Sequence, residues 1–169
     1  MAPAVPTLYI AIDGTGVPVV PSETEGRKGK DETGIARTRE AKLGVVFTQT
    51  TVDEEGYAVR DEASTTYVGA IETAEEFGRR IYAEAVRRGL NRAQRVIILG
   101  DGAVWIRGIA EEHFIGATQI VDIYHSLEHL SDLAKLLYGP TGDLVASWNK
   151  TQCTELKEGD VENVIAAMK

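Results

Sequence analysis

The sequence contains very little cysteine, no long apolar run and no surplus of positive charge. Cys153 is the one cysteine among 169 residues, so an internal disulfide is impossible and we expect a reducing compartment. No leader resembles a signal peptide, and no apolar run is long enough to cross a bilayer, so we expect no membrane association. The net charge of -8 argues against avid, non-specific binding of nucleic acid by this segment alone. It does not exclude an acidic metal site.

Two short apolar runs each end in an aspartate followed by glycine. Leu8–Ile12 precedes Asp13-Gly14, and Val96–Leu99 precedes Gly100-Asp101-Gly102. Such runs are typical of buried strands, and sites in open α/β sheets form at the carboxyl edge of the strands. If the two strands are neighbours, Asp13 and Asp101 converge although 88 positions separate them, from 13 to 101. Taken singly, each Asp-Gly pair is more often an ordinary turn.

The remaining patterns predict a mixed α/β fold. Gly44–Val52, Tyr57–Val59 and Thr65–Ala70 are typical of strands, and with the strand at Leu8 they predict an antiparallel meander. Thr73 and Gly89 bracket an amphipathic helix. Further elements are expected at Ala103–Glu111 (helix), Ala117–Asp122 (strand), Tyr124–Tyr138 (helix), and Thr141–Leu156 and Asp160–Met168 (weaker helices). This order predicts a ribonuclease H-like fold, with a mixed five-stranded sheet and flanking helices.

The segment from Pro21 to Lys42 is polar and rich in both signs of charge, which indicates a mobile loop. Its basic side chains are candidates for contacts with DNA phosphates. Because acidic residues are interspersed among them, a solvated loop without a ligand is the competing interpretation. The candidates are Arg27, Lys28, Lys30, Arg37, Arg39 and Lys42.

Several blocks together resemble the ISKra type of bacterial insertion-sequence transposases, D-D-E enzymes related to the Mutator-like group. They are AIDGTGVPV, KLGVVFTQT, STTYVGAIETAEEFGRRIYAEA, ILGDGAVWI and QIVDIYHSLEHL, in this order along the chain. The resemblance implies that Asp13 and Asp101 are the first two catalytic acids and metal ligands. It also implies that Asp122 and His125 form the D-x-x-H pattern, with an auxiliary role.

The same resemblance implies the chemistry and the partners. In the intact enzyme two Mg²⁺ or Mn²⁺ ions would serve hydrolysis of DNA and then strand transfer. The partners would be transposon ends and target DNA, and the full-length enzyme would be a homo-oligomer. We expect a cytoplasmic protein, nucleoid-associated when bound to DNA.

The chain departs from this family in two places. The third catalytic acid, a glutamate beyond a helical insertion, has no counterpart in this chain, and neither does the N-terminal DNA-binding region. We therefore expect residues 1–140 to be the first part of the catalytic core and 141–169 the start of the insertion. A segment of this kind is expected to be inactive alone.

Two other functions are compatible with parts of the sequence. His125-Ser126-Leu127-Glu128-His129 satisfies H-x-x-E-H, a zinc metallopeptidase pattern, but no third protein ligand stands out downstream. That interpretation also leaves Asp13 and Asp101 unexplained. The other alternative is an inactive transposase remnant that acts as a scaffold or binding domain.

Overall fold

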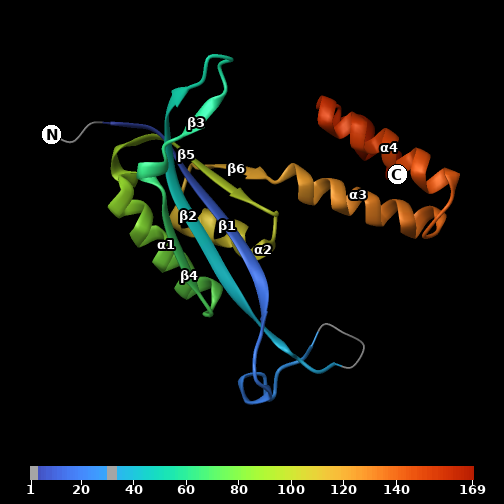
Figure 1. The fold of residues 1–169 in the computed structure, drawn as a ribbon, viewed down its shortest axis with the longest axis horizontal. Helices are drawn as coiled ribbons and strands as arrows, with labels where there is room; N and C mark the ends of the chain where they lie inside the picture. Colours follow the sequence, from blue (N-terminus) through green and yellow to red (C-terminus); the bar gives the residue numbers. More distant parts are fainter. Residues whose placement is uncertain (1–3, 30–33) are drawn as a thin grey trace. The chain divides into compact units, whose positions relative to one another are not determined.

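The computed structural model describes residues 4–29 and 34–169, which divide into two compact units. The first unit extends to Ile120 and the second comprises Val121–Lys169 (Figure 1). In the described part of the chain, every helix is too short or too polar to span a bilayer.

The first unit is built on one mixed sheet. Its strands are β1 (Val5–Pro18), β2 (Thr38–Val52), β3 (Ala58–Arg60), β4 (Thr66–Ala70), β5 (Ala93–Gly100) and β6 (Thr118–Val121). The strand order is β3-β2-β1-β5-β6, and β4 pairs with β2 as well. β2 is antiparallel to β1, β3 and β4, whereas β1 and β5 are parallel. β3 and β4 together therefore form the third strand of the predicted meander.

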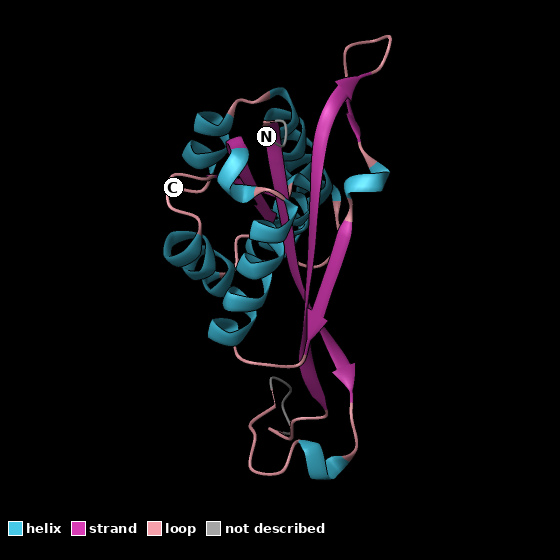
Figure 2. Cartoon of the chain, turned by 90° about the vertical axis from the view of Figure 1, so that its left-hand side faces the viewer, coloured by secondary structure: helices cyan, strands magenta, loops and turns pink. Residues whose placement is uncertain are grey.

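The strands β1 and β2 are longer than the sequence predicts. Their pairing continues past Asp13, from Gly14 with Lys42 to Pro18 with Thr38, and Figure 2 shows the resulting long strands. The predicted loop from Pro21 to Lys42 is therefore wrong at its end, because residues from Thr38 onward belong to β2. The extension is a pairing between distant segments, which local polarity does not reveal.

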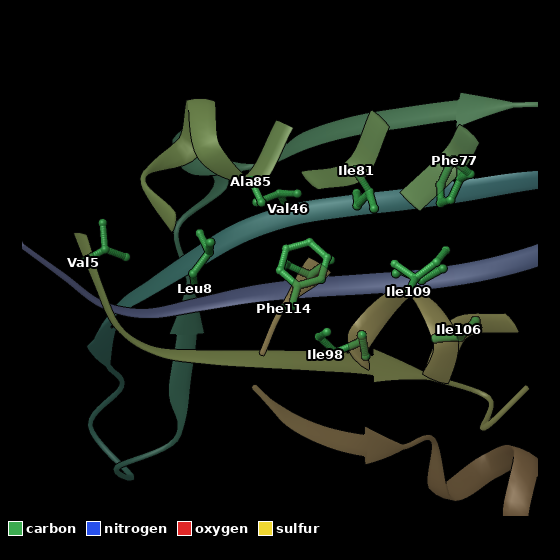
Figure 3. Packing of buried hydrophobic residues seen from close by; sticks show 13 residues of the cluster. Val5, Leu8, Val46, Phe77, Ile81, Ala85, Ile98, Ile106, Ile109 and Phe114 are labelled. Atoms are coloured by element: carbon green, nitrogen blue, oxygen red, sulfur yellow. The ribbon is translucent and has the colours of Figure 1, made fainter. Parts of the chain in front are cut away.

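One face of this sheet is covered by the helices α1 (Ala74–Arg88) and α2 (Val104–His113). Alternate β1 residues, Leu8, Ile10 and Ile12, are buried on this face. Phe77 and Ile81 of α1 and Ile106 and Ile109 of α2 complete the core with Val46 and Ile98. Figure 3 shows these side chains meeting between the strands and the two helices.

Helix α1 begins and ends where the sequence predicts. The Thr73 hydroxyl accepts a hydrogen bond from the Glu76 amide (3.2 Å), and the Glu76 carboxylate accepts one from the Thr73 amide (3.0 Å). Gly89 ends the helix in the left-handed conformation, at φ 107°. A capped helix of this kind fixes the start of β5, which follows it.

The second unit contains the helices α3 (Ile123–Tyr138), α4 (Asp143–Glu158) and α5 (Val161–Ala167). α3 packs against α4 and α4 against α5. Leu130 and Ala134 of α3 and Val164 of α5 are buried, and the rings of Tyr138 and Trp148 lie 6.2 Å apart. All three predicted helices are present, and the predicted domain boundary after residue 140 stays a prediction.

Candidate functional site at the carboxyl edge of β1 and β5

Asp13 lies on the sheet face opposite to the two helices. A Cβ on the next residue, Gly14, would come within 3.2 Å of the Trp105 ring of α2, so position 14 faces the helices. Because side chains alternate along a strand, Asp13 faces the other way, and it is exposed. Its Oδ1 accepts a hydrogen bond from the Gly14 amide at 2.7 Å.

Asp101 is placed by the turn between β5 and α2. A Cβ on Gly100, the last residue of β5, would lie 3.0 Å from Ile106 of α2, so Gly100 faces the helices. Asp101 follows directly after the strand and is half-buried. Asp101 Oδ1 accepts a hydrogen bond from the Ala103 amide at 2.8 Å. Gly102 adopts φ 84°, a conformation that favours glycine and lets the chain turn into the helix.

The pairing of β1 with β5 relates the positions of the two aspartates. Partner residues differ by 88 positions throughout, from Val5 with Ala93 to Ala11 with Leu99. Continued two residues beyond the end of this pairing, the register would set Asp13 beside Asp101. Neighbouring strands lie about 4.8 Å apart, a separation at which two carboxylates on one face can share a cation.

The donor set fits a hard divalent cation. Both side chains offer carboxylate oxygens, the ligands that Mg²⁺ and Mn²⁺ prefer, and each has one oxygen oriented by a backbone amide. In the described part of the chain, no three histidine, cysteine, aspartate or glutamate side chains lie together as a metal site. The two aspartates alone make an incomplete set of protein ligands, with the remaining positions open to water or phosphate oxygens.

Sequence reasoning missed a buried cationic group beside this edge. Lys42 pairs in register with Gly14 and is 6% exposed. Its Nζ donates to Glu40 Oε2 (2.6 Å) and to the Glu72 carbonyl (3.1 Å), and it lies 5.2 Å from the centre of the Trp105 ring. Lys42, Gly44 and Val46 occupy every second position of one strand and therefore share a face, and this spacing could have indicated that Lys42 is buried. We call Lys42, Glu40 and Trp105 the Lys42 cluster.

The prediction that Lys42 contacts DNA is wrong. Lys42 is buried in the sheet rather than exposed on a loop, so its ammonium group is not available to phosphates. Arg39 also lies in β2, where it pairs with Glu23 at 3.0 Å. Arg27, Lys28 and Arg37 are exposed, and Lys30 lies outside the described residues.

Asp122 and His125 belong to the second unit. Asp122 is the N-cap of α3, where its Oδ1 accepts a hydrogen bond from the Tyr124 amide at 2.9 Å. His125 lies in the first turn of that helix, half-exposed. The cap explains Asp122 locally, and the auxiliary role of both residues stays a prediction.

No protein-family model matches the chain, and no curated protein matches it. Among solved structures, it is similar to the Drosophila P element transposase strand transfer complex, with 10% sequence identity and a TM-score of 0.38. The match covers 76% of this chain and 28% of that chain. The chain therefore spans about 28% of that neighbour's length.

The class of fold follows from the sheet itself. The sheet runs from the third strand of the meander (β3 and β4) through β2 and β1 to β5 and β6, and α1 and α2 cover one face. This is the ribonuclease H-like arrangement. The predicted fold class is confirmed.

Proposed function

We propose that the chain is part of the catalytic domain of a D-D-E transposase, in which Asp13 and Asp101 hold Mg²⁺ or Mn²⁺. The observation that supports this proposal is the register of β1 and β5, which, continued two residues beyond Ala11 and Leu99, would place the two aspartates opposite each other. The resemblance of the sequence blocks to ISKra-type transposases supports the same residues independently.

The geometry assigns each carboxylate a defined orientation. The Gly14 amide donates to Asp13 Oδ1 and the Ala103 amide to Asp101 Oδ1, so the Oδ2 atom of each carboxylate would be the one to bind a cation. Bound there, divalent ions stabilise the charge that develops on phosphate oxygens and activate the attacking hydroxyl. The Gly14 amide belongs to β1 and the Ala103 amide to the turn before α2, and both orient a carboxylate oxygen before any cation binds.

In the intact enzyme, water would attack the phosphodiester at the element end and free a 3′ hydroxyl. That hydroxyl would then attack target DNA in line. The rest of the enzyme would supply the third carboxylate, the remaining ligands of the second ion and the DNA-binding surface. The intact enzyme would act as a homo-oligomer. Arg27, Lys28 and Arg37 would add phosphate contacts from this segment.

A Mn²⁺ titration followed by electron paramagnetic resonance tests the site on this chain. We expect saturable binding by the wild-type chain that weakens at least about tenfold in Asp13→Ala and in Asp101→Ala. Each variant loses half of the protein's ligands to a dication. Glu111→Ala removes an exposed carboxylate from α2 and is the matched control, expected to bind as the wild type does.

Mn²⁺ binding that is unaffected by both aspartate variants would refute the site. No saturable binding by the wild-type chain would favour the alternative function, an inactive remnant acting as a scaffold. In an intact enzyme, Asp101→Ala should abolish strand transfer while circular dichroism remains unchanged, and retained strand transfer would contradict the catalytic role.

A further inference from the structure

Two histidines meet on the surface of α3, in the second unit. His125 and His129 are one helical turn apart, and their Nε2 atoms lie 2.8 Å from each other. The ring centroids are 4.3 Å apart and the ring planes are inclined at 80°. One ring must donate and the other accept, so the Nε2 atoms of the two rings point toward each other. His129 is exposed and His125 half-exposed, so that position is open to solvent.

Carboxylates lie around this pair. Glu128 Oε2 is 3.8 Å from His125 Nδ1, the ring nitrogen that faces away from His129. Asp132 lies one turn beyond His129, and its pKa is lowered by the hydrogen bond from Lys135, with a smaller contribution from His129. Histidines that bind metals generally direct the other ring nitrogen to a carboxylate, which fixes the tautomer and makes the ligand more basic. The Glu128 carboxylate could take this role after approaching the ring from its present 3.8 Å to hydrogen-bond distance.

We propose that His125 and His129 form a binding site for a transition-metal cation of the Zn²⁺ class, with Nε2 of each ring as ligand. Bonds of about 2.0–2.1 Å at a tetrahedral angle need the two nitrogens about 3.3 Å apart. The rings therefore need to separate by about half an ångström from their mutual hydrogen bond, a small rotation for exposed side chains. The Glu128 carboxylate favours a positive charge at this position, whereas the Asp132 carboxylate is already paired with Lys135 at 2.8 Å.

The site differs in kind from the carboxylate edge formed by Asp13 and Asp101. Imidazole nitrogen favours Zn²⁺, Cu²⁺ and Ni²⁺, whereas Mg²⁺ favours oxygen. In the described residues no third protein ligand joins the pair, so water completes the coordination and a peptidase centre is not implied. A bound cation would link two turns of α3 and stabilise that helix. This proposal does not depend on the proposed function.

Zn²⁺ titration of the full chain in competition with a chromophoric chelator, with 10-fold excess Mg²⁺ over Zn²⁺ present, tests the site. Cys153→Ala is the background for all variants, because its thiol is a competing soft ligand. We expect one Zn²⁺ per chain, bound at least about tenfold more weakly in His125→Ala and in His129→Ala, since losing an outer-shell partner alone costs that much. Zn²⁺ should also raise the thermal midpoint of α3 unfolding in the background chain only.

A spacing variant provides the matched control. His129→Ala combined with Ser131→His keeps two histidines on α3 but places them six residues apart, on different sides of the helix. It should bind as weakly as His129→Ala. Absence of saturable binding by the background chain, a loss smaller than threefold in both single variants, or full affinity in the spacing variant would each overturn the proposal. Unchanged far-ultraviolet circular dichroism shows that the variants are folded.

Discussion

The ammonium group of Lys42 connects three elements beside the candidate site. It belongs to β2, donates to the carbonyl of Glu72 ahead of α1, and lies over the Trp105 ring of α2. The Trp105 ring in turn lies 3.2 Å from the position that a Cβ on Gly14 would take, directly after Asp13. The Lys42 cluster therefore packs against the backbone that carries the first aspartate.

Replacing Lys42 by methionine keeps most of the apolar stem and removes the charge. We expect Lys42→Met to lower the free energy of unfolding by about 1–3 kcal/mol, because a buried carbonyl and the Trp105 face lose their partner. Urea denaturation measures the loss. Lys28→Met, at an exposed position of the loop, is the control and should stay within about 0.5 kcal/mol of the wild type. Equal stability of the two variants would contradict this account of Lys42.

At the scale of single residues, the site at Asp13 and Asp101 stays a prediction, whereas the placement of Lys42 on an exposed loop was wrong. An apolar run followed by Asp-Gly indicates the end of a buried strand. This holds for β5, which ends at Gly100, whereas β1 continues past Asp13 to Pro18. Lys42 follows a run of charges, which is typical of a solvated loop. Its burial depends on Glu40, Trp105 and the Glu72 carbonyl, whose approach is set by pairing between distant segments.

Helix α1 is held at its first turn by an ion pair outside the capping box. Arg80 donates two hydrogen bonds to the Glu72 carboxylate, at 2.7 and 2.8 Å. These hydrogen bonds hold the pKa of Glu72 below its usual value of 4.5. A carboxylate with a lowered pKa in the folded state stabilises the fold above its ordinary pKa, and the contribution is lost as the pH falls through the lowered value.

Glu72→Gln should therefore destabilise the chain at neutral pH and less so in acid. We expect the difference in free energy of unfolding between wild type and Glu72→Gln to be largest above pH 4.5 and to shrink at lower pH. Urea denaturation at a series of pH values measures it. Glu54→Gln, in the exposed turn between β2 and β3, should show no such convergence. A difference that grows on acidification would have the wrong sign.

At the scale of elements, the helices could be predicted more closely than the strands. Thr73, Glu76 and Gly89 are local signals, and α1 begins and ends at them. β1 was predicted to end at Ile12 because Asp-Gly-Thr-Gly is typical of a turn, yet the strand continues to Pro18. Its continuation depends on hydrogen bonds to β2, which no local pattern encodes.

The two compact units differ in how much apolar surface they bury. The first has a contiguous core that includes Leu8, Ile10, Phe77 and Ile81, all 0% exposed. In the second, buried apolar side chains are few among the described residues, and Leu136 and Leu144 are 83% and 71% exposed. Regions with few buried apolar contacts open at lower free energy.

Hydrogen exchange followed by mass spectrometry should separate the two units. We expect backbone amides of α3, α4 and α5 to exchange faster than those of β1 and β5, because their local opening exposes less apolar surface. Exchange of both groups at one common rate would show a single cooperative unit instead. Adding Zn²⁺ should slow exchange in α3 alone.

The shared register of β1 and β5 determines which changes in chain length the candidate site tolerates. Several elements lie between β1 and β5. Insertions or deletions in the loops that connect these elements should leave the alignment of Asp13 with Asp101 unchanged, since hydrogen bonding between β1 and β5 sets that alignment rather than the number of intervening residues. A single residue added within β1 or β5 would turn one aspartate toward α2 and break the pair. Related chains of different lengths should therefore vary outside these strands and never by one residue inside them.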